Sequence, residues 1–549
     1  MLFERSAGIL LHPTSLANNE GIGTLGKSAY TFIDWLSSAH IRIWQVLPLG
    51  PTGYGDSPYA AFSSFAGNPL LIDLEMLAAA GLLSEEAITL PDYLCAKGAV
   101  DFGSVVYWKL PLLKKAAARF LSSAYRKTHN EPDSNFAAYK AFCKAHPHLN
   151  EYALFMSIKE VYDKKAQEEQ LSGKLWNNYW PKDLAKCEPA AIKRWKTEHK
   201  TEIEIQKVMQ FFFFSQWNKL KAYAHQNSIS IIGDIPIFVA PDSADVWANQ
   251  SLFQLDSQGV PLVVAGVPPD YFSAQGQLWG NPLYDWDKMK ASKYRWWLDR
   301  IDLCLELVDY IRIDHFRGFE AYWAIPFGSK TAEHGTWQPC PGMDFFKAVK
   351  KHLVRKDKRY EKELPIIAED LGVITQEVEQ LRDAFHLPGM KVLQFAFSAA
   401  EVREKGFTNA FLPHTYHKHS VVYTGTHDNT TLRAWIESLS KEDLTVLLLY
   451  LNGESPSPAF LDNFVVDSTH EEADSVKAQL CKQLIKQALF SVAALAIIPF
   501  QDIHALGKEA RMNIPSTLGN NWTWRMNTNM LSAQEAAWLK DLVTASGRT

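Results

Sequence analysis

The sequence predicts an α/β protein, a (β/α)8 or TIM barrel with a large, mostly helical insertion after its second strand and smaller loop and helix insertions. Eight short apolar runs, rich in β-branched residues and bounded by Gly, Pro or Asp, recur along the 549 residues, as buried parallel strands do. Amphipathic stretches with apolar residues at three- and four-residue spacing lie between these runs. Strands that alternate with helices in this way favour a barrel.

The apolar runs give the positions of the eight expected strands in chain order: 8–13, 43–49, 230–238, 309–316, 365–371, 391–397, 421–428 and 495–502. The clearest amphipathic stretches predict helices at 28–41, 296–308 and 376–385.

The strand spacing is uneven, and this predicts the insertions. About 180 residues separate the second strand from the third, where a plain βα unit needs roughly 30. We therefore predict three parts: 1–75 with the first two strands, 76–205 as the inserted helical subdomain, and 206–549 as the rest of the barrel.

Two smaller insertions are expected in the last part, at about 239–295 and 429–494. The gap 239–308 has the composition of a Gly-, Pro- and aromatic-rich loop followed by a helix, and 429–494 contains helical segments. The four phenylalanines at 211–214 predict the buried face of the helix that leads into the third strand.

Composition and charge exclude several classes of protein. With 47% apolar and 21% charged residues the chain can bury a large core, unlike a disordered protein. A net charge of −5 and a pI near 6.4 argue against a nucleic-acid partner. No signal segment opens the chain, and its longest apolar runs are too short to span a membrane.

The cysteines are scattered without metal-ligand spacing, which predicts thiols in a reducing compartment and a cytoplasmic protein; they are Cys95, Cys143, Cys187, Cys304, Cys340 and Cys481. The aromatic content, 18 Trp, 20 Tyr and 30 Phe, fits either a large core or a groove in which rings stack on sugars.

Carboxylates follow several predicted strands. In a barrel of this kind the active site forms at the carboxyl ends of the strands. Asp314, Glu369 and Asp428 end three of the apolar runs. Asp234 lies within another run, the third predicted strand at 230–238. Each alone also fits a helix N-cap or a surface ion pair, but three at equivalent positions indicate a catalytic site.

Two of these carboxylates have neighbours that suit different roles. Arg312 and Asp314 are two residues apart on one strand, so they share a face, and the cation favours an ionised Asp314, as a nucleophile requires. The alternative is a structural ion pair. Glu369 has apolar neighbours, which favour a protonated acid. This combination suits retaining glycoside chemistry, in which two carboxyl groups lie about 5–5.5 Å apart.

Eight motifs in order along the chain resemble the 4-α-glucanotransferase family, also called amylomaltase or disproportionating enzyme, in its compact form without an N-terminal starch-binding module. They are GILLHPTSL (8–16), LPLGPTGYGDSPY (47–59), GDIPIFV (233–239), YFSAQGQLWGNPLYDW (271–286), RIDHFRGF (312–319), AEDLGVIT (368–375), YTGTHDN (423–429) and RMNIP (511–515).

The resemblance implies that Asp314 is the nucleophile and Glu369 the general acid/base, while Asp428 holds sugar hydroxyls in the transition state. It implies substrate contacts at Ser57, Tyr59, Asp234, Gln277, Trp279, Arg312, His315, His427 and Asn513. Tyr59 and Trp279 also fit rings that only pack loops, and Asp234 fits equally a residue that orders the barrel mouth. Thr430 stands where the family usually has an acidic residue.

The resemblance predicts an enzyme that transfers α-1,4-glucan segments between maltooligosaccharides, glycogen or starch-derived chains by a retaining double displacement, without cofactor or metal. The spacing of His414, His417 and His419 fits no common metal site. An α-glucan hydrolase of the α-amylase type is the alternative enzyme, and a non-catalytic glucan-binding barrel is the alternative of another class. The oligomeric state stays open.

Overall fold

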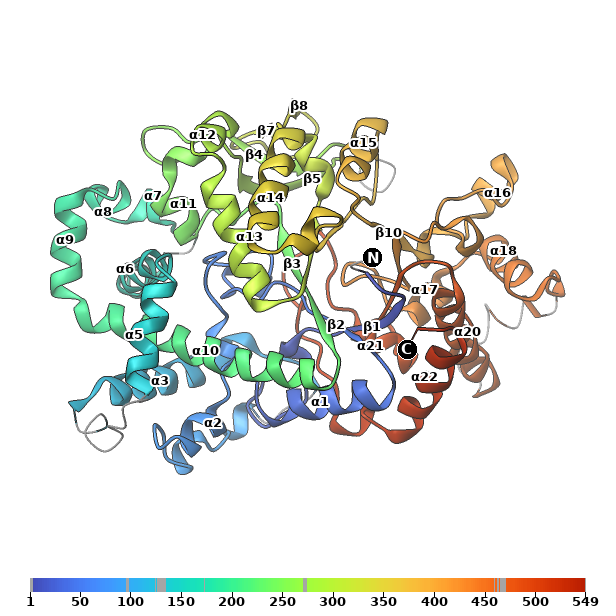
Figure 1. Ribbon diagram of the computed structural model, residues 1–549, viewed down its shortest axis with the longest axis horizontal. Helices are drawn as coiled ribbons and strands as arrows, with labels where there is room; N and C mark the ends of the chain where they lie inside the picture. The colour runs from blue at the N-terminus through green and yellow to red at the C-terminus, as the bar shows by residue number, and fades with distance from the viewer. Residues whose placement is uncertain are drawn as a thin grey trace.

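The computed structural model covers the whole chain (Figure 1). It describes residues 3–548 apart from short segments at 95–97, 124, 126–134, 172, 270–273, 459, 462–463 and 465–470.

Eight parallel strands form the central sheet, and each overlaps one of the eight predicted runs. In their order within the sheet they are β10 (Gly389–Val392), β11 (Ser420–Tyr423), β12 (Leu495–Pro499), β1 (Ser6–Leu10), β2 (Ile43–Gln45), β3 (Ser230–Pro236), β6 (Tyr310–Asp314) and β9 (Ile366–Ala368). Apart from the turning point at β12 and β1, neighbours in the sheet are neighbours in chain order among these eight strands. The predicted barrel is therefore confirmed.

Two contacts close this sheet. The last strand, β12, pairs with the first, β1, from Ser6 opposite Leu495 to Leu10 opposite Pro499. On the other side the Ala368 amide of β9 donates to the Pro388 carbonyl, which directly precedes β10, at 3.0 Å. Strands β11 and β12 are buried along their whole length, as strands covered on both faces are.

Helices surround the barrel, and the three helices predicted most clearly are confirmed: α1 (Lys27–Ser38), α13 (Arg295–Leu307) and α15 (Gln376–Ala384). The other helices outside the large insertion are α11 (Ala244–Ala248), α12 (Trp286–Ala291), α14 (Gly342–Lys356), α16 (Ala399–Lys405), α17 (Leu432–Ser438), α18 (Lys441–Asn452), α20 (Glu471–Phe490), α21 (Phe500–Ile503) and α22 (Ala533–Ala545).

Between β2 and β3 the structure is helical, and Figure 1 shows most of these helices to one side of the barrel. They are α2 (Leu74–Ala79), α3 (Phe102–Leu121), α5 (Asn135–Ala145), α6 (Leu149–Glu168), α7 (Trp176–Tyr179), α8 (Lys182–Ala185), α9 (Pro189–Glu198) and α10 (Lys200–Gln226). Helix α10 is continuous across residue 205. We propose that its first half belongs to the insertion and its second half to the barrel.

The phenylalanine run lies in α10, where Phe212, Phe213 and Phe214 are each at most 5% exposed. Successive residues of a helix point in different directions, so a run buried in this way requires cover on several sides. Phe120 of α3 and Phe142 of α5 contact rings of this run, and along its whole length α10 also packs on α6, α1, α13 and β3. Phe211, the first of the four, is only partly buried.

The gap 239–308 was predicted as a loop followed by a helix, and the loop part of this prediction is wrong. It contains two strands of a second, antiparallel sheet with the order β5 (Gln277–Pro282), β4 (Val263–Val267), β7 (Ala321–Pro326) and β8 (Thr336–Pro339). Strands β4 and β5 are short, and β5 holds a glycine and a proline, so the local pattern for strands is weak.

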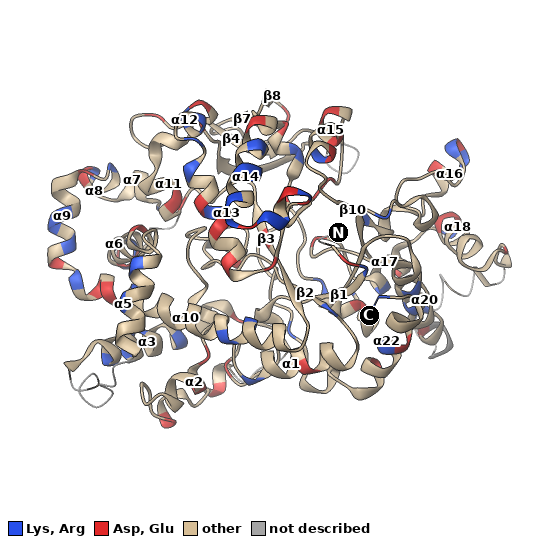
Figure 2. Ribbon diagram, in the orientation of Figure 1, with Lys and Arg blue, Asp and Glu red and all other residues tan. Residues whose placement is uncertain are grey.

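Charges of both signs are interspersed on the face of the molecule that Figure 2 shows, as expected for a net charge of −5. In the part of the chain that the structure describes, no helix has the length and apolar character to cross a membrane. The five described cysteines are free thiols, and Cys95 lies outside the described residues.

Candidate active site

Carboxylates gather at the carboxyl ends of three neighbouring strands. Ile313 of β6 lies opposite Ala368 of β9, so the next residues, Asp314 and Glu369, leave the barrel at the same level. Asp234 lies opposite Arg312 in the pair formed by β3 and β6. The strand register therefore brings these four side chains to one mouth of the barrel.

Arg312 connects two of the carboxylates. One guanidinium nitrogen, Nη1, lies 2.7 Å from Asp234 Oδ2, and the other, Nη2, lies 2.8 Å from Asp314 Oδ1. Burial lowers the pKa of Arg312, but the two carboxylates outweigh this effect and raise it above its ordinary value. The guanidinium therefore stays charged, and its planar fork fixes both carboxylates at once.

Glu369 has a different environment. Its Oε2 accepts a hydrogen bond from the His315 amide at 2.7 Å, and its Oε1 accepts one from the Leu371 amide at 2.9 Å. Burial, followed by the charge of Asp314, raises the pKa of Glu369 to about 8 against the opposing charge of Arg312. Glu369 therefore holds a proton at neutral pH, as predicted from its apolar neighbours.

Tyr59, on the loop after β2, completes the buried polar cluster. Its hydroxyl donates to Asp234 Oδ2 at 2.8 Å, and its ring stacks on the ring of His427 with centroids 4.9 Å apart. Ser57 contacts the cluster through Tyr59, whose amide donates to Ser57 Oγ at 3.2 Å. In the described structure the second oxygen of Asp234, Oδ1, is buried without a hydrogen-bond partner.

Asp428 lies in the loop after β11, facing the loop that holds Asn513. Asn513 Nδ2 donates to Asp428 Oδ1 at 2.6 Å, and Arg511 Nη2 donates to the Asp428 carbonyl, also at 2.6 Å. His427 Nε2 lies 3.4 Å from Asp428 Oδ1. Asp428 is therefore in direct contact with the loop that carries RMNIP, a contact that was not predicted from the sequence.

Gln277 and Trp279 lie on β5, an edge strand of the second sheet, and not on an irregular loop. Trp279 Nε1 donates to Gln277 Oε1 at 3.2 Å, and the indole, 38% exposed, meets the His315 ring edge to face at 4.8 Å. Burial lowers the pKa of His315 to about 4. Its Nε2 is buried, with no hydrogen-bond partner in the described part of the chain.

Three residues of the site were missed by sequence reasoning. His12, which follows β1, is buried beside His427, and burial lowers its pKa to about 3. Trp522 packs against the rings of Tyr59 and His427, with centroids 5.8 Å away in both cases, and Arg511 supports Asp428. The signal for His12 was present, because it is a polar residue that ends an apolar run.

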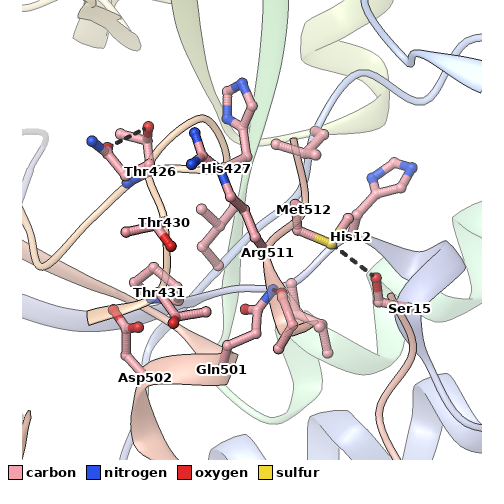
Figure 3. A pocket seen from close by; sticks show the side chains of 16 residues that line it. His12, Ser15, Thr426, His427, Thr430, Thr431, Gln501, Asp502, Arg511 and Met512 are labelled. Atoms are coloured by element: carbon pink, nitrogen blue, oxygen red, sulfur yellow. Dashed lines mark hydrogen bonds between the residues drawn. The ribbon is translucent and has the colours of Figure 1, made fainter. Parts of the chain in front are cut away.

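A cavity of about 30 Å³ lies behind the segment that carries His427. Figure 3 shows Thr430, Thr431 and Asp502 on one side of it and His12 and Ser15 on the other. The Thr430 side chain lines this cavity, and its carbonyl accepts from Gln394 Nε2 at 3.0 Å. The described residues include no group of three or more His, Cys, Asp or Glu arranged to hold a metal ion.

Comparison with known proteins gives one consistent family. A family model described as 4-alpha-glucanotransferase matches residues 11–531. The 4-alpha-glucanotransferase of Synechocystis sp. is 44% identical over 557 residues, covering 100% of this chain and 99% of the relative. That of Thermus thermophilus is 44% identical over 552 residues, covering 100% of both chains.

A solved structure agrees with these sequence relatives. The amylomaltase from Streptococcus agalactiae, in complex with acarbose, is similar with a TM-score of 0.86 and 34% sequence identity, covering 99% of this chain and 100% of that chain. With the family model spanning nearly the whole chain and relatives well above 30% identity over their full length, the chain belongs to the 4-alpha-glucanotransferase family.

Proposed function

We propose that this 4-alpha-glucanotransferase transfers α-1,4-glucan segments by a retaining double displacement, with Asp314 as nucleophile and Glu369 as general acid/base. One observation carries the assignment: two carboxyl groups end neighbouring strands, one ion-paired with Arg312 and the other with its pKa raised to about 8. An ionised and a protonated carboxyl group side by side are what this reaction needs.

In the first half-reaction an Asp314 oxygen attacks the anomeric carbon of the donor glucan. The bond from that carbon to the glycosidic oxygen breaks, and Glu369 gives its proton to the departing oxygen. The leaving segment departs with a free 4-hydroxyl, and the donor segment stays bound to Asp314 as an ester.

In the second half-reaction the 4-hydroxyl of an acceptor glucan attacks the same carbon. Glu369, now ionised, takes the hydroxyl proton, the ester bond to Asp314 breaks, and an α-1,4 bond is restored. The charges support this change of role: esterification removes the negative charge of Asp314, which contributes to the raised pKa of Glu369, so Glu369 loses its proton more readily in the intermediate.

The remaining residues suit the holding of the sugar. We propose that Asp428, held by Asn513, and His427 bind hydroxyls of the ring at the cleaved bond. Tyr59, Arg312 and Asp234 form one hydrogen-bonded group, and the Asp234 side chain is fully buried, so its proposed role is to order the barrel mouth.

Water competes with the acceptor for the ester. Trp279, exposed on β5 and in contact with His315, would cover a bound acceptor and exclude water.

Incubation with maltotriose tests transfer against the alternative of hydrolysis. Transfer yields glucose and chains longer than maltotriose, with a constant number of reducing ends, whereas a hydrolase yields shorter chains and new reducing ends.

Two substitutions test the residue roles. Asp314→Ala and Glu369→Gln are each expected to lower kcat for maltotriose by about 100- to 10,000-fold, with the fold intact by circular dichroism. The matched control is Asp302→Asn, because Asp302 is also a partly exposed, ion-paired carboxylate but bonds His352 and Lys356 on the helices outside the barrel. Near wild-type turnover in either site variant contradicts the assignment.

We further propose that the substrates are maltooligosaccharides and glycogen or starch-derived chains, bound without a cofactor. The amylomaltase from Streptococcus agalactiae was solved in complex with acarbose, and this likeness supports a saccharide substrate for the present chain. We also propose a cytoplasmic location, because the five described cysteines are free thiols and disulfides are rare in that compartment.

A further inference from the structure

Asp502 is a buried carboxylate below the active site that the mechanism does not use. It lies in α21, just after β12, and is 2% exposed. Its two oxygens have separate partners: Oδ2 accepts from the Thr424 hydroxyl at 2.6 Å, and Oδ1 accepts from the Leu432 amide at 2.7 Å.

These two partners are the ends of one segment, residues 424–432, which carries His427 and Asp428. Thr424 directly follows β11, and Leu432 is the first residue of α17. The Leu432 amide is one of the helix-starting donors that have no acceptor within the helix. The Asp502 carboxylate therefore bonds both the first and the last residue of the 424–432 segment.

The 424–432 segment is stiff between these ends. Asn429 Oδ1 accepts from the Thr426 amide at 2.8 Å and from the Thr426 hydroxyl at 2.9 Å, which closes a tight turn around His427 and Asp428. A stiff turn that is held at both ends transmits a shift of its anchors to the side chains it carries.

A cavity of about 30 Å³, lined in part by Thr426, His427 and Asp502, lies beside the 424–432 segment (Figure 3). The middle of the segment is held by side-chain bonds from Gln394 to the Thr430 carbonyl and from Arg511 and Asn513 to Asp428. The bonds to Asp502 hold its two ends.

We propose that Asp502 is a positioning residue, which sets the place of Asp428 and His427 in the active site by anchoring both ends of the 424–432 segment. The proposal rests on the proposed role of Asp428 in binding the sugar. Asp502 does not touch the substrate. Its contribution is geometric, and a displacement of about 1 Å in such a group costs up to about 100-fold in rate.

The chain offers a matched control in Asp73. This carboxylate is 5% exposed and has the same kinds of partner, because it accepts from the Thr24 hydroxyl at 2.8 Å and from the Met76 amide at 2.9 Å. It holds the start of α2 and carries no residue of the site. Asp73→Asn and Asp502→Asn thus make the same change in two places: each removes the charge and one of two acceptor oxygens.

The test measures kcat and KM for maltotriose transfer per folded molecule, together with Tm. The melting temperature, Tm, is expected to fall in both Asp502→Asn and Asp73→Asn. Asp502→Asn is expected to lower kcat about 10- to 100-fold with KM changed less than about threefold, whereas Asp73→Asn keeps the wild-type kcat. An Asp502→Asn protein whose kcat falls no further than that of Asp73→Asn overturns the proposal.

A double-mutant cycle distinguishes positioning from other effects. In an Asp428→Asn background, adding Asp502→Asn is expected to lower kcat by a smaller factor than it does in the wild-type background, because the part of its effect that acts through Asp428 is already lost. A fully additive loss overturns the positioning role of Asp502 alone. Near wild-type turnover of Asp428→Asn by itself contradicts instead the proposed function of Asp428.

A second variant keeps the test available if Asp502→Asn does not accumulate as folded protein. Thr424→Val removes the hydroxyl that donates to Asp502 and keeps the volume. Thr24→Val removes the corresponding donor to Asp73 and, in addition, the acceptor of the Asn18 amide. Thr424→Val is expected to lower kcat in the same direction as Asp502→Asn, and a kcat equal to that of Thr24→Val overturns the proposal.

Discussion

Arg312 sets the charges of the site from a single position in β6. Its guanidinium is 3% exposed and donates to Asp234 with one nitrogen and lies against Asp314 with the other. Glu369 accepts instead from two backbone amides, which do not carry a full charge. The two carboxyl groups that we propose as nucleophile and acid/base thus differ, because Asp314 has a cation as partner and Glu369 has backbone amides.

This arrangement predicts what a lysine would do at position 312. A lysine carries the same charge, but it lacks the planar fork that reaches Asp234 and Asp314 together. Arg312→Lys is therefore expected to lower kcat for maltotriose about 100-fold with a small change in Tm. Steady-state kinetics beside a melting curve check it, and a kcat within threefold of wild type would show that the fork is dispensable.

The raised pKa of Glu369 predicts the pH dependence of the reaction. The free enzyme needs Glu369 protonated, and its pKa lies at about 8, so kcat/KM is expected to fall as pH rises through about 8. A glucosyl fluoride donor reacts without an acid, because fluoride needs no proton to leave. With this donor and the Glu369→Gln variant, the decline of kcat/KM at alkaline pH should disappear. A decline that persists unchanged in Glu369→Gln would assign it to another group.

At the scale of elements, the barrel strands were predictable because each is an apolar run buried on both faces, a property of the run itself. The second sheet was not. Its strand β8 is mostly exposed, and β4 pairs with residues about 60 positions away in β7. Such strands are formed by tertiary pairing, which leaves little local pattern.

The residues of the site also divide into those that the local sequence predicts and those that only long-range contacts bring together. Asp314 and Glu369 could be found because they end apolar runs in consecutive strands. Trp522 could not, because its contact with Tyr59 joins segments from opposite ends of the chain, and the residues around it give no periodic signal. His12, like Asp314, is a polar residue at the end of an apolar run. It was not predicted, because only carboxylates were considered at these positions.

Trp279 lies on β5 and is partly exposed, and its proposed role is to cover a bound acceptor and exclude water. Trp279→Ala is expected to raise the share of hydrolysis in maltotriose turnover several-fold, because the indole no longer covers the ester. The control is Trp337→Ala, since Trp337 lies on the opposite edge strand, β8, with a similar exposure of 42%. The measurement counts new reducing ends against total product, and an equal ratio in both variants would contradict the role of Trp279.

At the scale of the whole molecule, the two ends of the chain meet beneath the barrel. Arg548 is fully buried, and its guanidinium donates to backbone carbonyls of β1 and of the segment before β12, namely Ser6, Leu489, Ser491, Ala493 and Ala494. Arg5 donates to the Ser546 and Ala493 carbonyls close by. The pair of strands that closes the barrel is thus bonded to the last helix.

Arg548→Ala is expected to destabilise the fold by about 2 to 4 kcal/mol, because five backbone carbonyls lose a hydrogen bond from a charged, buried donor. The expected signature is a lower denaturant midpoint and Tm, with kcat of the folded protein unchanged. The exposed Arg403 of α16 gives the control Arg403→Ala. Equal midpoints for the two variants would show that the ends of the chain do not hold the barrel closed.

The central claim is that Asp314 bonds to the donor sugar while Glu369 transfers the proton. The most direct test uses Glu369→Gln with maltotriosyl fluoride, whose leaving group needs no acid, so that the first step proceeds and the second lacks its base. Mass spectrometry of the digested protein is expected to find one maltotriosyl unit on Asp314. A unit on another residue, or release of fluoride with no adduct on Asp314, would contradict the account.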